Sequence, residues 1–231
     1  MASSTSLGLE TRTEDVLAYL PISSIMEYRK GQMIYGPNKL SKSIYLVVTG
    51  KIGISQVSED GSEVLLEIVS PDDLFGESAF LDVPGRSERA IAIETATLMN
   101  WAISDMEDLV MKRPRLAVAL LQILAQRNAE FTCRIESFAI DTIERRLARS
   151  LIHLSERLGT PESDGFVRMM PLTHDMLSRY IGTSREIVTQ YMNRFRKKGY
   201  VSYSRRGIQV YRDTLKRVLD RSAFPAEQTS S

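Results

Sequence analysis

Cysteine and histidine are scarce in this sequence. Its 231 residues include one cysteine, Cys133, and two histidines, His153 and His174. A single thiol excludes an intrachain disulfide, and an iron–sulfur cluster needs four cysteines. Both histidines lie in the second half of the chain, and we expect each to be structural or solvent-exposed rather than a heme or metal ligand. We therefore expect no metal site, no covalent cofactor and a reducing, cytoplasmic location.

Long hydrophobic runs are also lacking. The longest strongly apolar stretch, 116–125, contains Gln122 and is shorter than the about 20 residues that a membrane-spanning helix needs. The N-terminal residues are small and polar, without the basic and then apolar order of a secretion signal. These absences predict a protein with no membrane partner.

Neither sign of charge dominates the whole chain, but its two parts differ. The formal net charge is +1, and the composition of 43% hydrophobic and 26% charged residues is ordinary for a folded globular protein. Residues 1–140 include 13 basic and 19 acidic residues, a net charge of −6, whereas 141–231 include 17 and 10, a net charge of +7. The split predicts two domains, the second a candidate for binding a polyanion. The alternative is a chance distribution of solvated charges.

Short apolar runs separated by glycine-marked turns occupy positions 31–99. In the turn at 58–62, Asp60-Gly61 supplies the positive φ that a tight hairpin requires. We interpret 90–97 as a single closing strand and Trp101, just beyond it, as a core residue. Strands of this kind predict an antiparallel roll or barrel, and with the helices that follow they place the protein in the α+β class.

From Pro114 onward the hydrophobic period changes from 2 to about 3.5. Residues at alternating spacings of four and three form an unbroken heptad seam, namely Ala117, Leu121, Leu124, Asn128, Phe131, Ile135 and Phe138. Such a seam predicts a parallel homodimer in which the polar Asn128 sets the register. The alternative is a long helix packed on its own β domain. Leu116, Leu120 and Ile123 on a neighbouring face are suited to that packing while the seam faces another subunit.

A further helix is predicted over 141–158, ending near Gly159 and followed by a loop at 159–165. Its leucines are expected to face inward and its arginines outward. The leucines are Leu147, Leu151 and Leu154, and the arginines are Arg145, Arg146 and Arg149. This helix begins the basic part of the chain.

Two more helices, joined by a short turn, follow an extended piece at 166–171. Thr173 is the expected N-cap of the first helix, which stops at Gly182, and Ser184 caps the second, which stops at Gly199. Their buried residues are Met176, Leu177, Tyr180 and Ile181 on the first, and Val188, Met192 and Phe195 on the second. A strand, a basic turn and a strand then follow in the rest of the chain. This order predicts a winged helix-turn-helix.

The second helix of this pair presents polar residues of the types that read base edges in DNA. They are Arg185, Glu186, Thr189, Gln190 and Asn193. Basic residues at the helix end and in the wing turn suit backbone phosphates. They are Arg196, Lys197, Lys198, Arg205 and Arg206, and Thr173 and Ser184 at the helix N-termini join the expected DNA interface. The alternative is that Arg185 and Glu186 form a surface ion pair.

Another candidate binding set lies in the β-rich part. Gly76 exposes backbone N–H groups, Glu77 and Ser78 follow it, and Arg86-Ser87 comes after a short excursion. Together these groups suit a ligand with a phosphate and a ribose. The alternative is structural, with Gly76 turning the chain and Glu77 paired to Arg86.

The two sets occur in the order of a known family. The Gly-Glu and Arg-Ser pairs, and Gly-Thr-Ser-Arg-Glu at 182–186, resemble the phosphate-binding cassette and the recognition-helix entrance of the cyclic-AMP receptor protein/FNR family of bacterial transcription regulators. The resemblance covers about residues 25–212. It implies an N-terminal cyclic-nucleotide-binding-type β-roll, a long dimerisation helix and a C-terminal winged helix-turn-helix.

The resemblance also implies roles for individual residues. The effector contacts would be Gly76, Glu77, Ser78, Arg86, Ser87 and Thr132, with the arginine and its serine on the cyclic phosphate and the glutamate on the ribose. The sequence departs from the family pattern at Glu88, where nucleotide-binding relatives have alanine. This carboxylate suits a phosphate only if it turns away or pairs with Arg89. Phe131 replaces a hydroxyl residue beside the purine, and Gln190 replaces an arginine that reads a base.

The sequence thus predicts a dimeric, sequence-specific DNA-binding transcription regulator. It does not predict an enzyme, because no nucleophile–base pair or metal-ligand cluster is visible. The expected divisions are a sensor domain at 1–114, a dimerisation helix at 115–140, a DNA-binding domain at 141–221 and a tail at 222–231. Expected partners are a second copy of the chain, a pseudo-palindromic double-stranded DNA site and RNA polymerase. The favoured effector is cyclic AMP or another cyclic nucleotide in the roll, and the alternative is another ligand or none.

Overall fold

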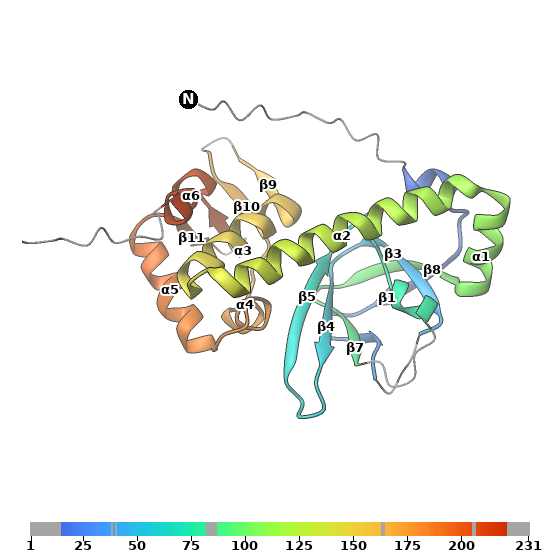
Figure 1. Ribbon diagram of the computed structural model, residues 1–231, viewed down its shortest axis with the longest axis horizontal. Coiled ribbons are helices and arrows are strands. Elements are labelled where there is room, and N and C mark those ends of the chain that lie inside the picture. The colour runs from blue at the N-terminus through green and yellow to red at the C-terminus, as the bar shows by residue number, and fades with distance from the viewer. Residues whose placement is uncertain are drawn as a thin grey trace, which may run out of the picture.

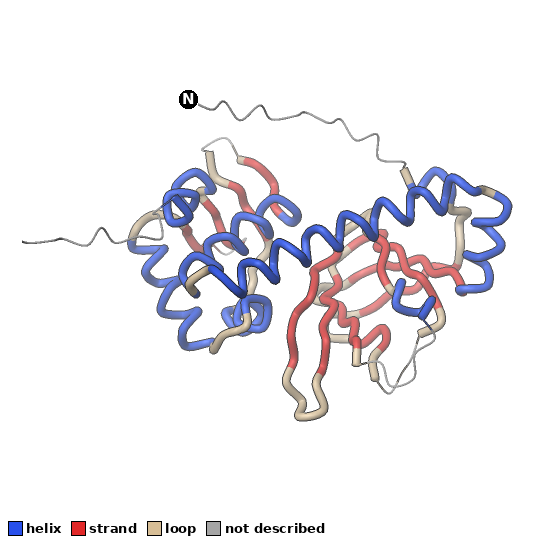
Figure 2. Tube along the Cα trace, in the orientation of Figure 1, coloured by secondary structure: helices blue, strands red, loops and turns tan. Residues whose placement is uncertain are grey.

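A β-rich N-terminal part and a smaller C-terminal part are joined by one long helix, α2 (Pro114–Ile140), as Figures 1 and 2 show. The computed structural model describes residues 15–37, 39, 41–81, 87–162, 165–204 and 207–220. The tail expected at 222–231 lies outside the described residues, as do Arg86, Arg205 and Arg206. No helix in the described part of the chain has the length and apolarity of a membrane span.

Two four-stranded antiparallel sheets enclose the N-terminal core. The strands are β1 (Ser24–Tyr28), β2 (Met33–Tyr35), β3 (Ser43–Thr49), β4 (Ile52–Val57), β5 (Glu63–Val69), β6 (Leu74–Phe75), β7 (Glu88–Ala92) and β8 (Ala96–Ala102). Their spatial orders are β1-β8-β3-β6 and β2-β7-β4-β5. Val47, Ile52 and Leu98 are 0% exposed between the sheets. The prediction of a β-roll is therefore confirmed.

The strand predicted over 90–97 is wrong in one respect, because the segment forms parts of two strands. β7 and β8 are separated by a short break and belong to different sheets. At the break the Ile93 N–H donates to the Lys51 carbonyl at 2.9 Å, which holds the chain while it crosses between sheets. The hairpin predicted around 58–62 joins β4 to β5, and Trp101 is buried as expected.

Helix α2 packs one face on the roll and leaves its heptad seam in solvent. The short helices η1 (Val16–Tyr19), η2 (Glu77–Leu81) and α1 (Ile103–Lys112) accompany the roll. Leu116 is 0% exposed in a core cluster with Trp101, and Leu120 and Ile123 pack partly against it. On the seam, Leu121 is 64% exposed and Ile135 68%. The face suited to the roll packs on it, and the seam stays exposed, so the predicted homodimer remains a prediction.

The C-terminal part is a winged helix-turn-helix, as predicted. Its elements are α3 (Ile143–Leu158), β9 (Gly159–Pro161), β10 (Val167–Met169), α4 (His174–Ile181), α5 (Arg185–Lys197), β11 (Val201–Ser204), β12 (Gly207–Val210) and α6 (Arg212–Asp220). The expected loop at 159–165 begins instead with β9, which pairs with β10 at the edge of the sheet β11-β12-β10-β9. The last helix, α6, was not anticipated from the sequence, and its buried Leu215 and Val218 join the core of this part.

The arginines of α3 were expected to face outward, but all three hold the connection to α2 and α4. Asp141, between α2 and α3, accepts hydrogen bonds from Arg145 at 3.0 Å and from Arg149 at 2.8 Å. Burial opposes ionisation, yet these bonds and one from Ser137 lower the pKa of Asp141 to about 2. Arg146 donates to the Ile181 carbonyl at 2.9 Å. Arginine therefore fixes the angle at which the chain turns after α2.

Two carboxylates of β5 tie the roll to the C-terminal part. Glu63 pairs with Arg179 of α4, and Glu67 accepts from Arg157 of α3 at 2.7 Å. Glu67 also pairs with Arg127 of α2 at 3.3 Å, although its own side chain is only 10% exposed. These three ion pairs connect the roll, the long helix and the C-terminal part to one another.

Candidate DNA-binding surface and roll interior

The turn between α4 and α5 is set by residues that the sequence identified. The Thr173 side chain accepts from Met176 N–H at 3.0 Å, and Ser184 accepts from Ile187 N–H at 3.3 Å. Gly182 ends α4 in the left-handed conformation with φ 67°. A side chain there would also collide, because an added Cβ would lie 2.9 Å from Phe138 of α2. The turn is therefore fitted against the long helix.

Replacing Gly182 by alanine is expected to lower the free energy of unfolding by more than the about 1–2 kcal/mol that left-handed backbone costs a non-glycine residue. The excess comes from the contact with Phe138. Urea denaturation of the parent and the variant measures the change in the free energy of unfolding. Gly165→Ala is the matched control, since Gly165 has φ 75° and nothing lies within 4 Å of its would-be Cβ. Equal losses in the two variants would argue against a close contact at Gly182.

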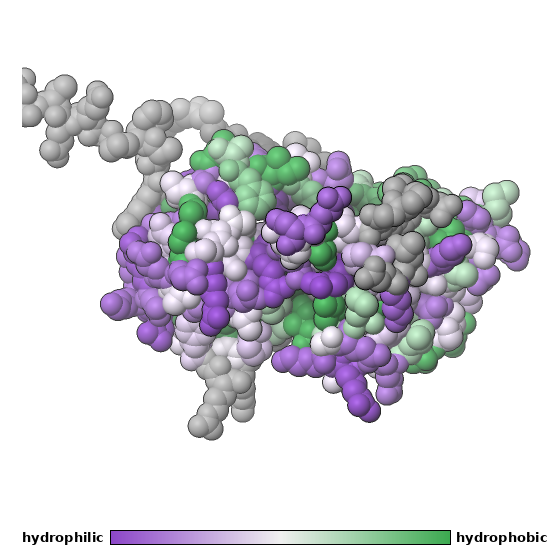
Figure 3. Space-filling view, turned by 90° about the horizontal axis from the view of Figure 1, so that it is seen from below, coloured by the Kyte–Doolittle hydropathy of each residue, from purple (hydrophilic) through white to green (hydrophobic). Residues whose placement is uncertain are grey.

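Helix α5 packs its apolar stripe inward and presents polar side chains to solvent. Val188, Met192 and Phe195 are 0% exposed. On the outer side Arg185, Glu186 and Gln190 are exposed, and Asn193 is half-buried. These side-chain types are those that read base edges in the major groove. On the face seen from below, hydrophilic residues predominate at the outer end of the C-terminal part (Figure 3).

Thr189, the remaining predicted base-reading residue, has a hydroxyl that is already engaged. It donates to the Arg185 carbonyl at 2.8 Å and lies 2.8 Å from Nδ1 of His174. The other ring nitrogen of His174, Nε2, is 3.0 Å from the Tyr203 hydroxyl in the wing. His174 thus joins α4, α5 and β11, and because the Thr189 proton is used on Arg185, Nδ1–H of the ring donates to the Thr189 hydroxyl. Its position directly after the N-cap gave no sign of this bridge.

Acidification is expected to loosen this part of the protein. Burial and the nearby Arg185 lower the pKa of His174. A depressed folded-state pKa means that the stabilisation is present above the unfolded value of about 6.5 and is lost as pH falls through the folded value. Denaturant midpoints measured from about pH 8 to about pH 5 should therefore fall. His174→Gln should flatten this dependence in part, the remainder coming from His153, whose pKa burial also lowers. An unchanged slope would remove His174 from the explanation.

Among the described basic residues at the end of α5, some pair with a carboxylate of α3 and others are exposed. Arg194 and Lys198 lie 3.5 Å and 4.0 Å from Glu144 of α3. Arg196 and Lys197 are exposed at the end of α5. The latter two are therefore the described cations best placed for phosphates.

In the roll, the predicted cassette residues are held by partners other than those expected. Gly76 has φ 89°, and an added Cβ would lie 2.8 Å from the Ser43 carbonyl, so the site requires glycine. Glu77 pairs with Arg127 of α2 at 2.6 Å. The alternative of a Glu77–Arg86 pair stays a prediction, because Arg86 lies outside the described residues. Nothing in the spacing of the sequence pointed to Arg127.

Glu88 neither turns away from the roll nor pairs with Arg89. Its carboxylate accepts from the Tyr35 hydroxyl at 2.7 Å and from the Ser78 hydroxyl at 2.8 Å. Arg89 pairs with Glu63 instead. Burial, followed by the charge of Glu88, raises the pKa of Tyr35, so the phenol stays protonated and donates. The predicted ligand residue Ser78 is thereby committed to a protein carboxylate.

Aromatic side chains fill the space beside the cassette. The rings of Tyr35 and Tyr45 are stacked with centroids 5.9 Å apart, and Tyr45 stacks on Phe75 at 5.1 Å. The Tyr45 and Ser41 hydroxyls are 2.8 Å apart. A cavity lined by Tyr35, Gly76 and Ser78 measures about 10 Å³, room for about one water molecule. The carboxylate-bearing residue Glu88 lies in the wall of this cavity.

The last two effector candidates lie at the edge of the roll. Ser87 accepts a hydrogen bond from the side-chain amide of Gln56. Thr132 is exposed on α2 and donates to the Asn128 carbonyl at 2.8 Å, within its own helix. Among the described residues no group of His, Cys, Asp and Glu is arranged to hold a metal ion.

Comparisons with known proteins match both parts of the chain. A model of the cyclic nucleotide-binding domain matches residues 25–113, and one of the Crp-like helix-turn-helix domain matches residues 145–218. The transcriptional regulator SdrP of Thermus thermophilus is 32% identical over 158 residues, which cover 68% of this chain and 73% of SdrP. The CRP-like cAMP-activated global transcriptional regulator of Mycobacterium tuberculosis is 24% identical over 185 residues, covering 80% of this chain and 83% of that protein. A solved CRP/FNR-family transcriptional regulator from Thermus thermophilus has a TM-score of 0.67 and 28% identity, covering 85% of this chain and 98% of the other.

Proposed function

Because the chain belongs to the CRP/FNR family of transcription regulators, which bind DNA and are not enzymes, we propose that it acts as a homodimer on pseudo-palindromic DNA. The observation that carries this proposal is α5, whose buried stripe is fully covered while Arg185, Glu186 and Gln190 are exposed on its other side. Two such helices related by a two-fold axis would enter successive major grooves. RNA polymerase is the further partner, and the cytoplasm the location, that this role implies.

The dimer is supported by the exposed seam of α2. Leu121, Leu124, Phe131, Ile135 and Phe138 are all at least 37% exposed. They are spaced as a coiled-coil seam over a helix of 27 residues. Single exposed hydrophobic residues are normal on a protein surface, whereas a contiguous apolar stripe marks an interface.

Selection of bound duplexes from a randomised pool tests the DNA-binding proposal. We expect enriched sequences to contain inverted repeats whose half-site centres are about 34–36 Å apart, the general spacing for helix-turn-helix dimers. Fluorescence anisotropy would then compare the selected duplex with a scrambled one. Affinities that do not differ between the two duplexes at physiological salt would contradict sequence-specific binding.

We propose further that a cyclic nucleotide in the roll does not gate DNA binding. The support is the Tyr35–Glu88–Ser78 contact and the small cavity beside it among the described residues. The matched cyclic nucleotide-binding domain model and the cAMP-activated relative favour the alternative, a nucleotide-gated regulator. The two hypotheses differ in whether the roll binds a cyclic nucleotide saturably.

Isothermal titration of the folded, dimeric protein with cyclic AMP and with cyclic GMP separates the readings. We expect no saturable heat from either nucleotide. Saturable binding that is lost in Arg86→Ala would establish the nucleotide-gated alternative. The same preparation should bind the selected duplex, so that an inactive sample is not mistaken for a nucleotide-independent one.

A further inference from the structure

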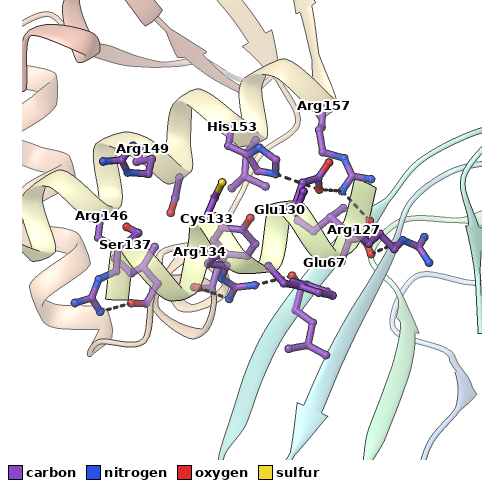
Figure 4. A pocket seen from close by; sticks show the side chains of 18 of the residues that line it. Glu67, Arg127, Glu130, Cys133, Arg134, Ser137, Arg146, Arg149, His153 and Arg157 are labelled. Carbon is purple, nitrogen blue, oxygen red and sulfur yellow. Dashed lines mark hydrogen bonds and ion pairs between the residues drawn. The ribbon is translucent and has the colours of Figure 1, made fainter. Parts of the chain in front are cut away.

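A cavity of about 330 Å³ lies where the roll, the long helix and the DNA-binding part meet. We call it the junction cavity. Its wall includes Leu66 and Ile68 of β5, Phe138 of α2, Leu154 of α3, and Tyr180 and Ile181 of α4, and Figure 4 shows α2 and α3 on either side of it. Sites for small molecules in proteins measure about 300–1,000 Å³. The junction cavity reaches that range, and the cavity beside Gly76 and Glu88 does not.

The wall of the junction cavity is mainly apolar and preformed. Ile68, Leu154, Tyr180 and Ile181 are each at most 6% exposed, in cores that do not depend on a ligand. Such a surface favours the aromatic or aliphatic body of a small molecule rather than a highly polar one. Shape and hydrophobicity alone, however, do not select a ligand class.

Charge selects it. Five arginines line the junction cavity, and three of them are paired with carboxylates: Arg127 and Arg157 with Glu67, and Arg149 with Asp141. The other two, Arg134 and Arg146, have no carboxylate within ion-pair distance among the described residues. Uncompensated cations in a low-dielectric site are costly, and an anion nearby offsets that cost.

Both uncompensated arginines are held in place by backbone carbonyls and aromatic rings. Arg134 donates to Leu66 of β5 at 2.7 Å and to the carbonyl of Tyr180 in α4, and its guanidinium lies 4.0 Å from the Tyr180 ring centroid. Arg146 lies 4.7 Å from the Phe138 ring centroid. The Nε atom of each is buried without a hydrogen-bond partner. Two fixed positive charges therefore stand beside an apolar cavity.

We propose that the junction cavity binds a small organic anion with an apolar body. Its body would lie against Leu154 and Ile181, and its anionic group would lie on the side of Arg134 and Arg146. A molecule there contacts β5 and α4 together, so it would stabilise one placement of the helix-turn-helix relative to the roll. The effect on DNA rests on the proposed function, whereas the binding itself does not.

The probe that tests the site is 1-anilinonaphthalene-8-sulfonate, an aromatic sulfonate, titrated into the full-length dimer by fluorescence and by equilibrium dialysis. We expect one saturable site per chain. Arg146→Met, which keeps side-chain length and removes the charge, should weaken binding by about tenfold, as for loss of one charge-assisted contact. Absence of a saturable site on the folded dimer, or unchanged affinity in Arg146→Met, would overturn the proposal.

Arg168→Met is the matched charge control. Arg168 also stacks on a phenylalanine, with its guanidinium 5.8 Å from the Phe166 ring, and its Nε is also buried without a partner. It lies outside the junction cavity and is paired with Glu162. Its replacement should leave probe affinity unchanged, and an equal loss in both variants would reduce the effect to net charge and overturn the site.

Two further arms identify the occupant. N-phenyl-1-naphthylamine, which has the same kind of body without the sulfonate, should bind more weakly, and equal binding would overturn the requirement for an anion. Ser150→Trp, which fills the cavity from α3, should block the sulfonate without removing a charge.

Probe binding confined to a monomeric variant carrying Leu121→Glu and Ile135→Glu would instead assign the cavity to the second subunit. A protein that binds the probe but no selected duplex would fail the proposed function and leave the site standing.

Discussion

Glutamate at both Leu121 and Ile135 is expected to turn the dimer into a monomer and to abolish binding to a site with two half-sites. These residues are the most exposed of the large hydrophobic residues of the seam, at 64% and 68%, so their replacement leaves the fold of the single chain intact. In a parallel dimer each carboxylate would be buried against its own copy, at a cost of about 3–5 kcal/mol for an uncompensated buried charge. Sedimentation velocity and anisotropy on the selected duplex measure the two losses.

The control for this variant is Met111→Glu. Met111 lies in α1, away from the seam, and is 81% exposed. It should remain dimeric and bind DNA as the parent does. A Leu121/Ile135 variant that still sediments as a dimer would remove α2 as the dimer interface.

Arg185→Ala should weaken binding to the selected duplex by about 1–3 kcal/mol, the usual worth of a bidentate arginine–guanine contact. Arg185 is exposed at the first turn of α5, where a recognition helix contacts base edges. The loss should appear with the selected duplex and vanish with a duplex changed at one G·C pair. Anisotropy titrations on both duplexes make the comparison.

Lys197→Ala gives the contrasting result. Lys197 is exposed at the end of α5, so its loss should weaken binding to all sequences alike and reduce the salt dependence by about one ion. If Arg185→Ala behaved in the same way, Arg185 would be a phosphate contact. If Arg185→Ala had no effect on either duplex, α5 would not be the reading helix.

Local signals in the sequence predicted the DNA-binding part well. The N-caps at Thr173 and Ser184, and the end of α4 at Gly182, depend on hydrogen bonds and φ angles within a few residues. The division of 90–97 into two strands could not be predicted in this way. It depends on which sheet each half joins, a long-range property that alternation of apolar residues does not encode.

The roll shows where prediction of a site from its residues stops. Gly76 was correctly identified as a turn residue, because its conformation is local. The partners of Glu77 and Glu88 are Arg127 and Tyr35, each about 50 positions away along the chain. Side chains of the right chemical type to bind a nucleotide can thus be hydrogen-bonded instead to residues that only folding brings near them. Thr189 illustrates the same limit in α5.

The ion pairs of β5 restrict where this chain tolerates a change in length. Glu63 meets Arg179, and Glu67 meets Arg127 and Arg157 at 2.7–3.3 Å. A residue inserted or deleted between the two glutamates would displace one carboxylate along the strand by about 3.3 Å, enough to break its contacts. The turn at 58–62 is bonded chiefly within itself, through Ser58, Asp60 and Ser62. Insertions and deletions should therefore accumulate among homologues at the tip of this hairpin, 58–62, and be excluded between Glu63 and Glu67. This holds whatever ligand or DNA site a homologue has acquired.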